Sequence, residues 1–354
     1  MLQKIKNYLV GLGADNRLTQ IALSWHGRRS GFVLDFSDST RIWLVRGNRR
    51  LALARRDLTF VPSIMDCFDI YFDGIEPVHA DGREDLDFSQ PGFHVYKRSG
   101  LGFFFPSIPE EEPLHQYTHW HTPSPGSIVW DAGAYAGATS CLLATMVGPE
   151  GRVYAFEPDD LNYAYLIRNI AHHGLTNIIP VRKALSGASG TAKFFMNGTV
   201  ASGIRDFIVY SDDVQSKDVP TISMEDACKE LGTVPSYIKM DIEGAELSFL
   251  EGAREFLKSH PVHFAIESYH RVGGDYTYKK LDPIFKEIGY EYLSSDLFMQ
   301  MFTWARPQTV APVVAVSHNT AVPLLSWRSL AIRTASAAFK EVCGLLPFYN
   351  EHAP

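Results

Sequence analysis

The stretch Val129–Ser140, VWDAGAYAGATS, decides the fold class that the sequence predicts. Apolar residues run into a carboxylate, Asp131, and small residues then occupy most of the following positions. A turn of the backbone by itself requires one glycine, not a whole segment without bulky side chains. We therefore expect a buried strand that ends at Asp131, a turn that lies against a ligand, and a helix that begins directly afterwards.

From Ser127 onward the sequence alternates between strand-like and helix-like segments. Strands are expected at residues 127–130, 152–156, 177–181, 236–240 and 262–267, and helices at residues 138–147, 160–173, 245–258 and 280–289. Residues 290–293 and 298–304 are expected to form a terminal antiparallel pair. Strands that alternate with helices are typical of a parallel sheet with helices on both faces, so the predicted fold class is α/β.

The first 120 residues show no such alternation. Runs at residues 31–36, 41–45 and 69–75 have the composition of short strands and predict a small, largely β module. Residues 106–127 are rich in proline and charge and are expected to form a linker or an ordered lid. Tyr117 and Trp120 are expected to have a mixed role, partly in the core of the module and partly in covering the ligand site. The three phenylalanines at residues 103–105 are expected in the core of the module.

These differences divide the chain into three expected parts. They are an accessory module with its linker over residues 1–122, a ligand-binding domain over residues 123–306, and a C-terminal tail over residues 307–354. Within the tail, an amphipathic helix is expected from Trp327 to Val342, with the role of docking or of forming a homo-oligomer.

The composition argues against several classes of protein. A formal net charge of −7 argues against a surface that binds nucleic acid. No run approaches the roughly 20 apolar residues that span a membrane, and the N-terminus lacks the apolar core of a signal peptide, so we expect a cytoplasmic protein. The four cysteines have no spacing that indicates zinc or a disulfide framework, and we expect reduced thiols.

The spacing after the first strand distinguishes between two cofactors. A dinucleotide site needs G-x-G-x-x-G, whereas this chain has D-x-G-x-x-x-G at Asp131, Gly133 and Gly137. Asp131 would repel a phosphate but attract an ammonium or a sulfonium group. Glu157, at the end of the second strand, can accept hydrogen bonds from both hydroxyls of a ribose. Glu157 alone fits NAD as well, but together the two acids predict S-adenosylmethionine; the alternative is that both acids merely cap helices. The missing G-x-G-x-x-G argues against a nicotinamide oxidoreductase.

The stretch Tyr237–Glu246, YIKMDIEGAE, places three carboxylates after the fourth strand. Acids are common at the N-terminus of a helix, which is an alternative explanation for Glu243 and Glu246 but explains Asp241 less well. Lys239 lies on the same side of the strand as Asp241. Because an isolated buried lysine is costly, Lys239 is expected to pair with a neighbouring carboxylate.

Four stretches, taken in order, resemble the FkbM family of S-adenosylmethionine-dependent methyltransferases. They lie between Val129 and Phe302 and read VWDAGAYAGATS, RVYAFEPDDLNYAYLIRN, YIKMDIEGAELSFLEGA and FAIES. The resemblance implies a class I methyltransferase fold, which is a Rossmann-like sheet of seven mostly parallel strands. It also implies an acceptor hydroxyl on a sugar, a glycan or a natural product. The first 120 residues and the tail lie outside the resemblance.

Positions within this resemblance imply the roles of individual residues. Asp241 is expected nearest to the acceptor oxygen, as the group that orients or deprotonates it, with Glu267 and His270 completing the acceptor side. His270 is either the alternative general base or a residue that supports the base through a hydrogen bond. Lys239 is a further catalytic candidate beside them. The residues expected to contact the cofactor are Asp131, Gly133, Ala134, Tyr135, Gly137, Glu157, Pro158, Lys183, Ala184, Leu185 and Asp241.

The histidines and the acids leave some alternatives open. His119 and His121 would share one face of a strand and, with His115, could bind a metal, but hydrogen-bonding histidines on a linker are the preferred interpretation. Asp241 and nearby acids could offer oxygen ligands to a divalent cation, but the spacing does not require one, and no residue is assigned to a metal. The alternative functions are a cation-dependent O-methyltransferase of small diols and a catalytically silent scaffold that binds S-adenosylmethionine.

Overall fold

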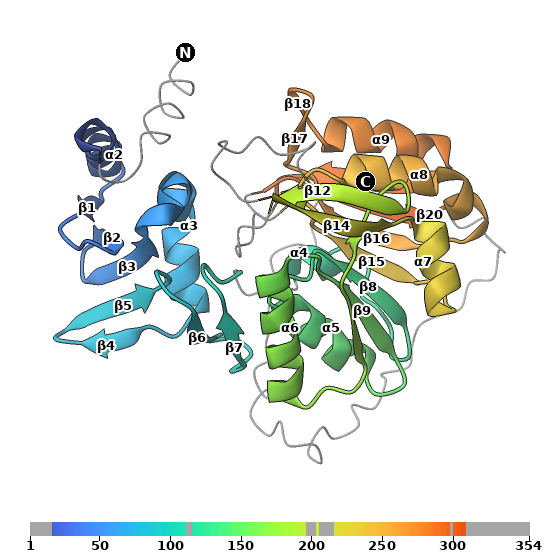
Figure 1. Cartoon of the computed structure of the whole chain (residues 1–354), viewed down its shortest axis with the longest axis horizontal. Helices are drawn as coiled ribbons and strands as arrows, with labels where there is room; N and C mark the ends of the chain where they lie inside the picture. The colour runs from blue at the N-terminus through green and yellow to red at the C-terminus, as the bar shows by residue number, and fades with distance from the viewer. Residues whose placement is uncertain (1–15, 111–114, 196–202, 205–215, 298–299, 309–354) are drawn as a thin grey trace, which may run out of the picture.

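The structure is a computed structural model of the chain, and it describes residues 16–110, 115–195, 203–204, 216–297 and 300–308. Figure 1 shows a central sheet with helices on both sides and a smaller module, built from the first part of the chain, beside it. The helix expected from Trp327 to Val342 lies outside the described residues.

A seven-stranded sheet forms the centre of the fold. Its order is β10-β9-β8-β15-β16-β20-β19, and only β20 runs against the other strands. The strands are β8 (Ile128–Ala132), β9 (Arg152–Phe156), β10 (Ile178–Val181), β15 (Tyr237–Met240), β16 (His263–Glu267), β19 (Tyr290–Ser295) and β20 (Phe302–Pro307). The five parallel strands and the terminal antiparallel pair are confirmed. The strand order reverses between β8 and β15, which is where sheets of this kind bind ligands.

Helices cover both faces of this sheet (Figure 1). One face carries α5 (Ala138–Val147) and α6 (Asp160–His173), and the other carries α7 (Met224–Leu231), α8 (Glu246–Ser259) and α9 (Tyr278–Glu287). The alternation of side chains along β8 explains the division, because Val129 packs in the core on one face and Trp130 in the core on the other. Gly174 ends α6 in a left-handed conformation, which glycine adopts without strain.

A second, smaller sheet was not expected from the sequence. It consists of β11 (Ala184–Leu185), β12 (Gly190–Phe195), β13 (Gly203–Ile204) and β14 (Ser216–Ile222), in the order β11-β14-β12-β13. A short hairpin, β17 (Arg271–Val272) and β18 (Asp275–Tyr276), follows β16. The smaller sheet matters for the site because β11 and β12 bring Ala184, Leu185 and Phe194 to the end of the central sheet.

The N-terminal module contains as much helix as strand, so its expected description as largely β is not confirmed. Five strands form one sheet in the order β1-β2-β3-β5-β4. They are β1 (Val33–Asp35), β2 (Arg41–Arg46), β3 (Arg49–Ala54), β4 (Val78–Ala80) and β5 (Arg83–Asp87). The helices are α2 (Arg17–Arg29), η1 (Arg55–Phe60) and α3 (Val61–Gly74), and β6 (Gly92–Val95) with β7 (Gly102–Phe105) forms a separate hairpin.

The strand expected at residues 69–75 is wrong, because this segment completes helix α3. Buried side chains recur along α3 at Val61, Ile64, Met65, Phe68, Tyr71 and Phe72, which is the spacing of one helical face. The window 69–75 contains only the last turn of this pattern. Its aromatic and β-branched residues, taken alone, have the composition of a strand.

The hairpin β6–β7 attaches the module to the domain that contains the seven-stranded sheet. The amide of Asn169 on α6 exchanges two hydrogen bonds of 2.8 Å with the backbone of Phe104 and donates a third, also 2.8 Å, to the carbonyl of Ala136. Phe103 and Phe105 are fully buried in the same hydrophobic core as Val129. Their expected place in a core is confirmed, and this core extends from the module into the sheet domain.

Among the described residues, no helix combines the length and the apolar character needed to cross a membrane. Cys67, Cys141 and Cys228 are free thiols, as expected, and Cys343 lies outside the described residues.

Candidate functional site

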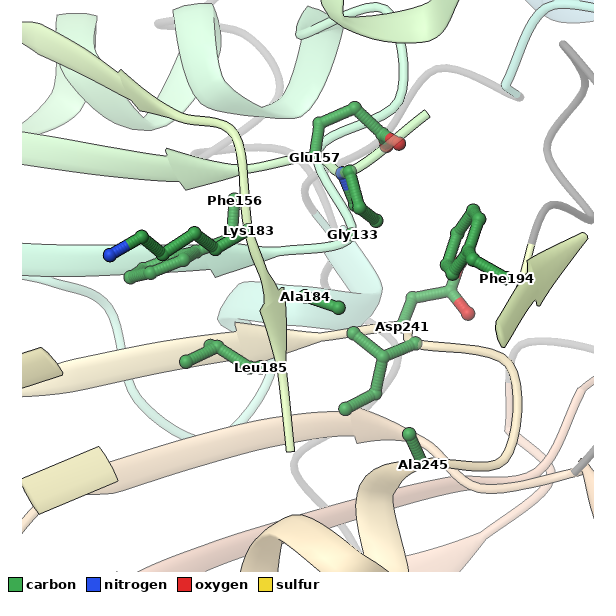
Figure 2. A pocket seen from close by; sticks show the side chains of 11 residues that line it. Gly133, Phe156, Glu157, Lys183, Ala184, Leu185, Phe194, Asp241 and Ala245 are labelled. Atoms are coloured by element: carbon green, nitrogen blue, oxygen red, sulfur yellow. The ribbon is translucent and has the colours of Figure 1, made fainter. Parts of the chain in front are cut away.

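A crevice opens at the carboxyl ends of β8, β9 and β15 (Figure 2). Its lining consists of Gly133, Phe156, Glu157, Pro158, Lys183, Ala184, Leu185, Phe194, Asp241, Ile242 and Ala245. Seven of the residues that were predicted to contact the cofactor line this crevice. They are Gly133, Glu157, Pro158, Lys183, Ala184, Leu185 and Asp241. Asp131, Ala134, Tyr135 and Gly137 are not part of the lining.

The glycines after β8 are required by close approaches within the protein. At Gly133, φ is +76°, and a Cβ would lie 1.8 Å from the carbonyl oxygen of Asp241. At Gly137, φ is +83°, and a Cβ would lie 2.4 Å from a methyl carbon of Leu166. Only glycine satisfies both the backbone angle and the lack of space. The turn after β8 therefore packs directly on the end of β15, and its predicted contact with a cofactor stays a prediction.

Glu157 presents an oriented carboxylate to the crevice. Its Oε2 accepts from the backbone N–H of Tyr135 at 2.9 Å, and its Oε1 accepts from that of Asp159 at 2.8 Å. Burial raises the pKa of Glu157 to about 8, although these two hydrogen bonds oppose the shift. Each carboxylate oxygen retains a lone pair, so Glu157 can still accept two further hydrogen bonds from a ligand.

Tyr135 and Ala134 shape the turn through their backbones. Tyr135 has a φ of +47°, which is uncommon for a residue with a side chain. Its phenol turns towards the N-terminal module and donates to the carbonyl of Ile108 at 2.9 Å. The N–H of Ala134 donates to the carbonyl of Phe156 at 3.0 Å. These residues fix the turn and the orientation of Glu157, and the lining of the crevice contains neither side chain.

The remaining lining of the crevice is largely apolar. Phe156, Phe194, Ile242 and Ala245 line it in addition to the predicted residues. Lys183 lies at its edge, but its ammonium binds Glu230 on α7 at 2.7 Å and points away from the crevice in Figure 2. Phe156 directly precedes Glu157, and Ile242 and Ala245 belong to the stretch Tyr237–Glu246, so local motifs contain these three residues. Phe194 depends on the placement of β12, which no local pattern predicts.

Asp131 and Lys239 form a buried ion pair across β8 and β15. Both side chains are fully buried, Lys239 Nζ lies 3.1 Å from Asp131 Oδ1, and the pairing of the two strands sets them opposite each other. Burial alone would lower the pKa of Lys239, but the carboxylate of Asp131 and those beyond it outweigh burial and raise this pKa. The predicted pairing of Lys239 with a carboxylate is confirmed.

This ion pair also occupies the side chain of Asp131. Asp131 Oδ2 accepts from Ser140 Oγ at 2.6 Å, and Lys239 Nζ donates to the carbonyl of Gly133 at 2.7 Å. Asp131 is therefore held beneath the turn, with an ammonium of the protein beside it. Its expected contact with the ammonium of a cofactor stays a prediction.

A cluster of acids surrounds His270 next to the crevice. His270 Nδ1 lies 3.1 Å from Glu246 Oε1, and Nε2 lies 3.4 Å from Glu243 Oε2 and 3.6 Å from Asp241 Oδ1. Burial lowers the pKa of His270, but Glu246, Glu243 and Asp241 outweigh it and hold this pKa well above its usual value. Burial also raises the pKa of Asp241, and it raises that of Glu243 to about 8. These neighbours therefore favour the protonated form of His270 at neutral pH over the free imidazole, which is the form that accepts a proton.

Glu267 and Tyr117 are hydrogen-bonded to each other beside this acidic cluster. The phenol of Tyr117 donates to Glu267 Oε1, and the phenol of Tyr237 donates to the carbonyl of Tyr117. Burial and the charge of Asp241 raise the pKa of Glu267 well above its usual value. Tyr117 belongs to the short helix α4 (His115–Thr118) in the predicted linker. The expected part of Tyr117 in covering the crevice thus has a contact that supports it.

The linker histidines do not lie on a shared strand face, because residues 119–122 are not a strand. His119 packs against Trp304, with ring centroids 5.0 Å apart, and His121 stacks on His263, with centroids 3.6 Å apart. Burial lowers the pKa of His121 to about 4. The expectation of a shared strand is therefore wrong, since the chain has just left helix α4 and passes over β20 and β16.

Residues 131–292 match the model of the methyltransferase FkbM domain. Within these residues, which are a little under half of the chain, the sequence is similar to the FkbM methyltransferase domain. The resemblance stated from the sequence is thereby confirmed, and the N-terminal module lies outside the matched residues. The central sheet of seven mostly parallel strands is the arrangement that the resemblance implies.

A curated relative shares 32% identity with this chain over 145 residues, the hexuronic acid methyltransferase AglP of Haloferax volcanii. The match covers 40% of this chain and 56% of AglP, so the chain spans little more than half of that relative's length. Among solved structures, methyltransferase FkbM from Methylobacillus flagellatus KT has a TM-score of 0.40 at 21% identity, covering 53% of this chain and 45% of that one. A TM-score this low supports no statement about function.

Replacing Lys239 with Met tests the buried ion pair of the FkbM domain. The variant leaves the Asp131 carboxylate buried and unpaired, which is expected to destabilise the fold by about 3–5 kcal/mol. Adding Asp131→Asn removes this charge and should restore much of the loss. Denaturant unfolding of the two variants measures the difference. Lys258→Met, which breaks an exposed ion pair, is the control and should cost less than about 1 kcal/mol. Equal stability of Lys239→Met and wild type would contradict the assignment.

Proposed function

We propose that this chain transfers the methyl group of S-adenosylmethionine to a hydroxyl oxygen of a sugar, a glycan or a natural product. The observation that carries the proposal is the position of Asp241. It lines the crevice that Glu157 enters, and it also belongs to the acidic cluster around His270. A nucleoside held by Glu157 and a hydroxyl held by the cluster would therefore meet at Asp241.

The crevice fits the chemistry of S-adenosylmethionine. Glu157 can accept both ribose hydroxyls because two backbone N–H groups already orient its carboxylate. Phe156, Leu185 and Phe194 offer apolar surface to a flat base, which suits an adenine ring. When bound, the cofactor supplies a methyl group on a positively charged sulfur. The negative charge around Asp241 favours such a cation nearby.

The acceptor side is polar and acidic, which suits a hydroxyl that must lose its proton. Asp241 Oδ1 makes no hydrogen bond within the protein and is free to accept one from an acceptor hydroxyl. Orienting the oxygen supplies the larger share of the acceleration, and removing its proton supplies a further factor of roughly 10²–10⁴. The name of AglP states a hexuronic acid, which is a sugar, and this supports a sugar hydroxyl as the acceptor.

The cofactor assignment predicts a loss of affinity when Glu157 is replaced by Gln. The amide turns one acceptor into a donor that faces a backbone N–H, and it removes charge-assisted hydrogen bonds worth roughly 1.5–3 kcal/mol each. The affinity for S-adenosylhomocysteine, measured by calorimetry, should fall about tenfold or more. Glu150→Gln makes the same change on the exposed turn after α5 and should leave the affinity unchanged. NAD should not bind. Unaltered binding by Glu157→Gln would remove Glu157 from the site.

The acceptor assignment predicts slower methyl transfer when Asp241 is replaced by Asn. The variant keeps the shape of the side chain but cannot take a proton, so the single-turnover rate should fall at least about a hundredfold. The assay uses saturating S-adenosylmethionine with a labelled methyl group, and oligosaccharides that end in a hexose or a hexuronic acid as acceptors. Asp218→Asn on the exposed face of β14 is the control. A near-wild-type rate for Asp241→Asn would move the proton acceptor to Glu267.

A further inference from the structure

Three side chains of the acidic cluster converge on one point. Asp241, Glu243 and His270 each offer a ligand atom, and these atoms all lie within 4.8 Å of one another. They come from two elements that the sheet holds together, since Asp241 and Glu243 follow β15 and His270 follows β16. The arrangement therefore does not depend on a single flexible loop.

The ring of His270 is aimed into this point without a hydrogen bond. His270 is 8% exposed, and its Nε2 faces the carboxylates of Glu243 and Asp241 at 3.4 and 3.6 Å without hydrogen-bonding to either. Asp241 Oδ1 also makes no hydrogen bond. Buried nitrogen and oxygen atoms are normally paired, so two unpaired atoms that face each other indicate a ligand between them.

The other side of the ring has the support that metal-binding histidines usually have. Nδ1 lies 3.1 Å from Oε1 of Glu246, whose side chain is fully buried. The same oxygen accepts from the backbone N–H of Ile242 at 3.1 Å, which fixes the carboxylate. A carboxylate behind a histidine orients the ring and makes the opposite nitrogen a better ligand.

We propose that Asp241, Glu243 and His270 bind a divalent cation, with Glu246 as the residue that positions His270. Four carboxylates, those of Asp241, Glu243, Glu246 and Glu267, face a single imidazole in this cluster, while the nearby Lys239 is paired with Asp131. A bound cation would favour the ionised forms of these carboxyl groups, which burial otherwise disfavours. One nitrogen and two carboxylate ligands suit Mn²⁺ or a similar transition metal better than Ca²⁺, which takes oxygen ligands.

A cation at this point would deepen the proposed function, and this part of the inference rests on that function. Three protein ligands leave coordination positions open. An acceptor hydroxyl could occupy one of them beside Asp241 and would lose its proton more readily there. The proton would pass to a carboxylate of the cluster as the oxygen forms its bond to the methyl carbon. The bond between this carbon and sulfur would break, and its electron pair would stay on sulfur.

Binding of Mn²⁺ tests the site directly and requires no acceptor. The full-length chain is stripped with a chelator and titrated with Mn²⁺ at pH 8, with free Mn²⁺ followed by electron paramagnetic resonance. The wild type should bind one Mn²⁺ per chain. Glu243→Gln and His270→Ala should each weaken this binding at least about tenfold, and Glu246→Gln by about 10- to 100-fold. His79→Ala, an exposed histidine on β4, is the matched control and should bind as the wild type does.

The same samples are titrated with S-adenosylhomocysteine, so that a failure of folding and a failure of the proposed function are both recognised. Glu243→Gln keeps its shape and is expected to retain this binding, which makes its loss of Mn²⁺ attributable to the ligand. If the wild type binds Mn²⁺ no more tightly than Glu243→Gln and His270→Ala, the cation site is overturned, whatever the cofactor result. If Mn²⁺ binds as expected but S-adenosylhomocysteine does not, the site stands and the proposed function fails.

Discussion

The ion pair between Asp131 and Lys239 is the constraint on which the geometry of the site depends. It joins β8 to β15 at the point where the strand order reverses, with both side chains fully buried. The same ammonium binds the carbonyl of Gly133, so the turn after β8 is tied to the strand that ends at Asp241. Two fully buried charges hold this geometry only if both partners are present, because either one alone would be left unpaired. The ion pair thus fixes the turn after β8 and the end of β15, which together form the base of the crevice.

The candidate site has two halves, a crevice and an acidic cluster, which meet at Asp241. On one side, Glu157 and the apolar residues of β9, β11 and β12 form a surface suited to a nucleoside. On the other side, carboxylates surround His270, and Tyr117 closes the cluster from the linker by donating to Glu267. Asp241 belongs to both halves. The segment that joins the N-terminal module to the FkbM domain therefore contributes Tyr117 to the acidic half of the candidate site.

Local patterns were sufficient to predict the central sheet and part of the site. Each parallel strand is a short apolar run between turn residues, and Asp131, Glu157 and Asp241 stand at or directly after the strand ends, where the alternation places them. The pairing of Lys239 followed from the cost of burying a charge alone. Gly133 was predicted to lie in the site, but the reason why this position needs a glycine was not predicted. That reason is the close approach of the Asp241 carbonyl, which depends on two strands far apart in the chain.

Some features were not predicted because they depend on contacts between residues far apart in the chain. Others were missed because the segment of sequence that was considered was too short to show its period. Tyr117 and Glu267 are separated by 150 positions, so no spacing indicates their hydrogen bond. Phe194 reaches the crevice only through the pairing of β12 with β14. Residues 69–75 form the end of helix α3, and only the longer stretch from Val61 shows the helical period. The convergence of His270 on two carboxylates likewise requires β15 and β16 to lie side by side.

A crystal structure of the chain with S-adenosylhomocysteine tests the central claim most directly. We expect the ribose hydroxyls within hydrogen-bond distance of both Glu157 carboxylate oxygens, the base against Phe156 and Leu185, and the sulfur on the side of Asp241. The acidic cluster would then lie on the side of the sulfur from which a methyl group leaves. A nucleoside bound elsewhere, or one whose sulfur points away from Asp241, would contradict the account.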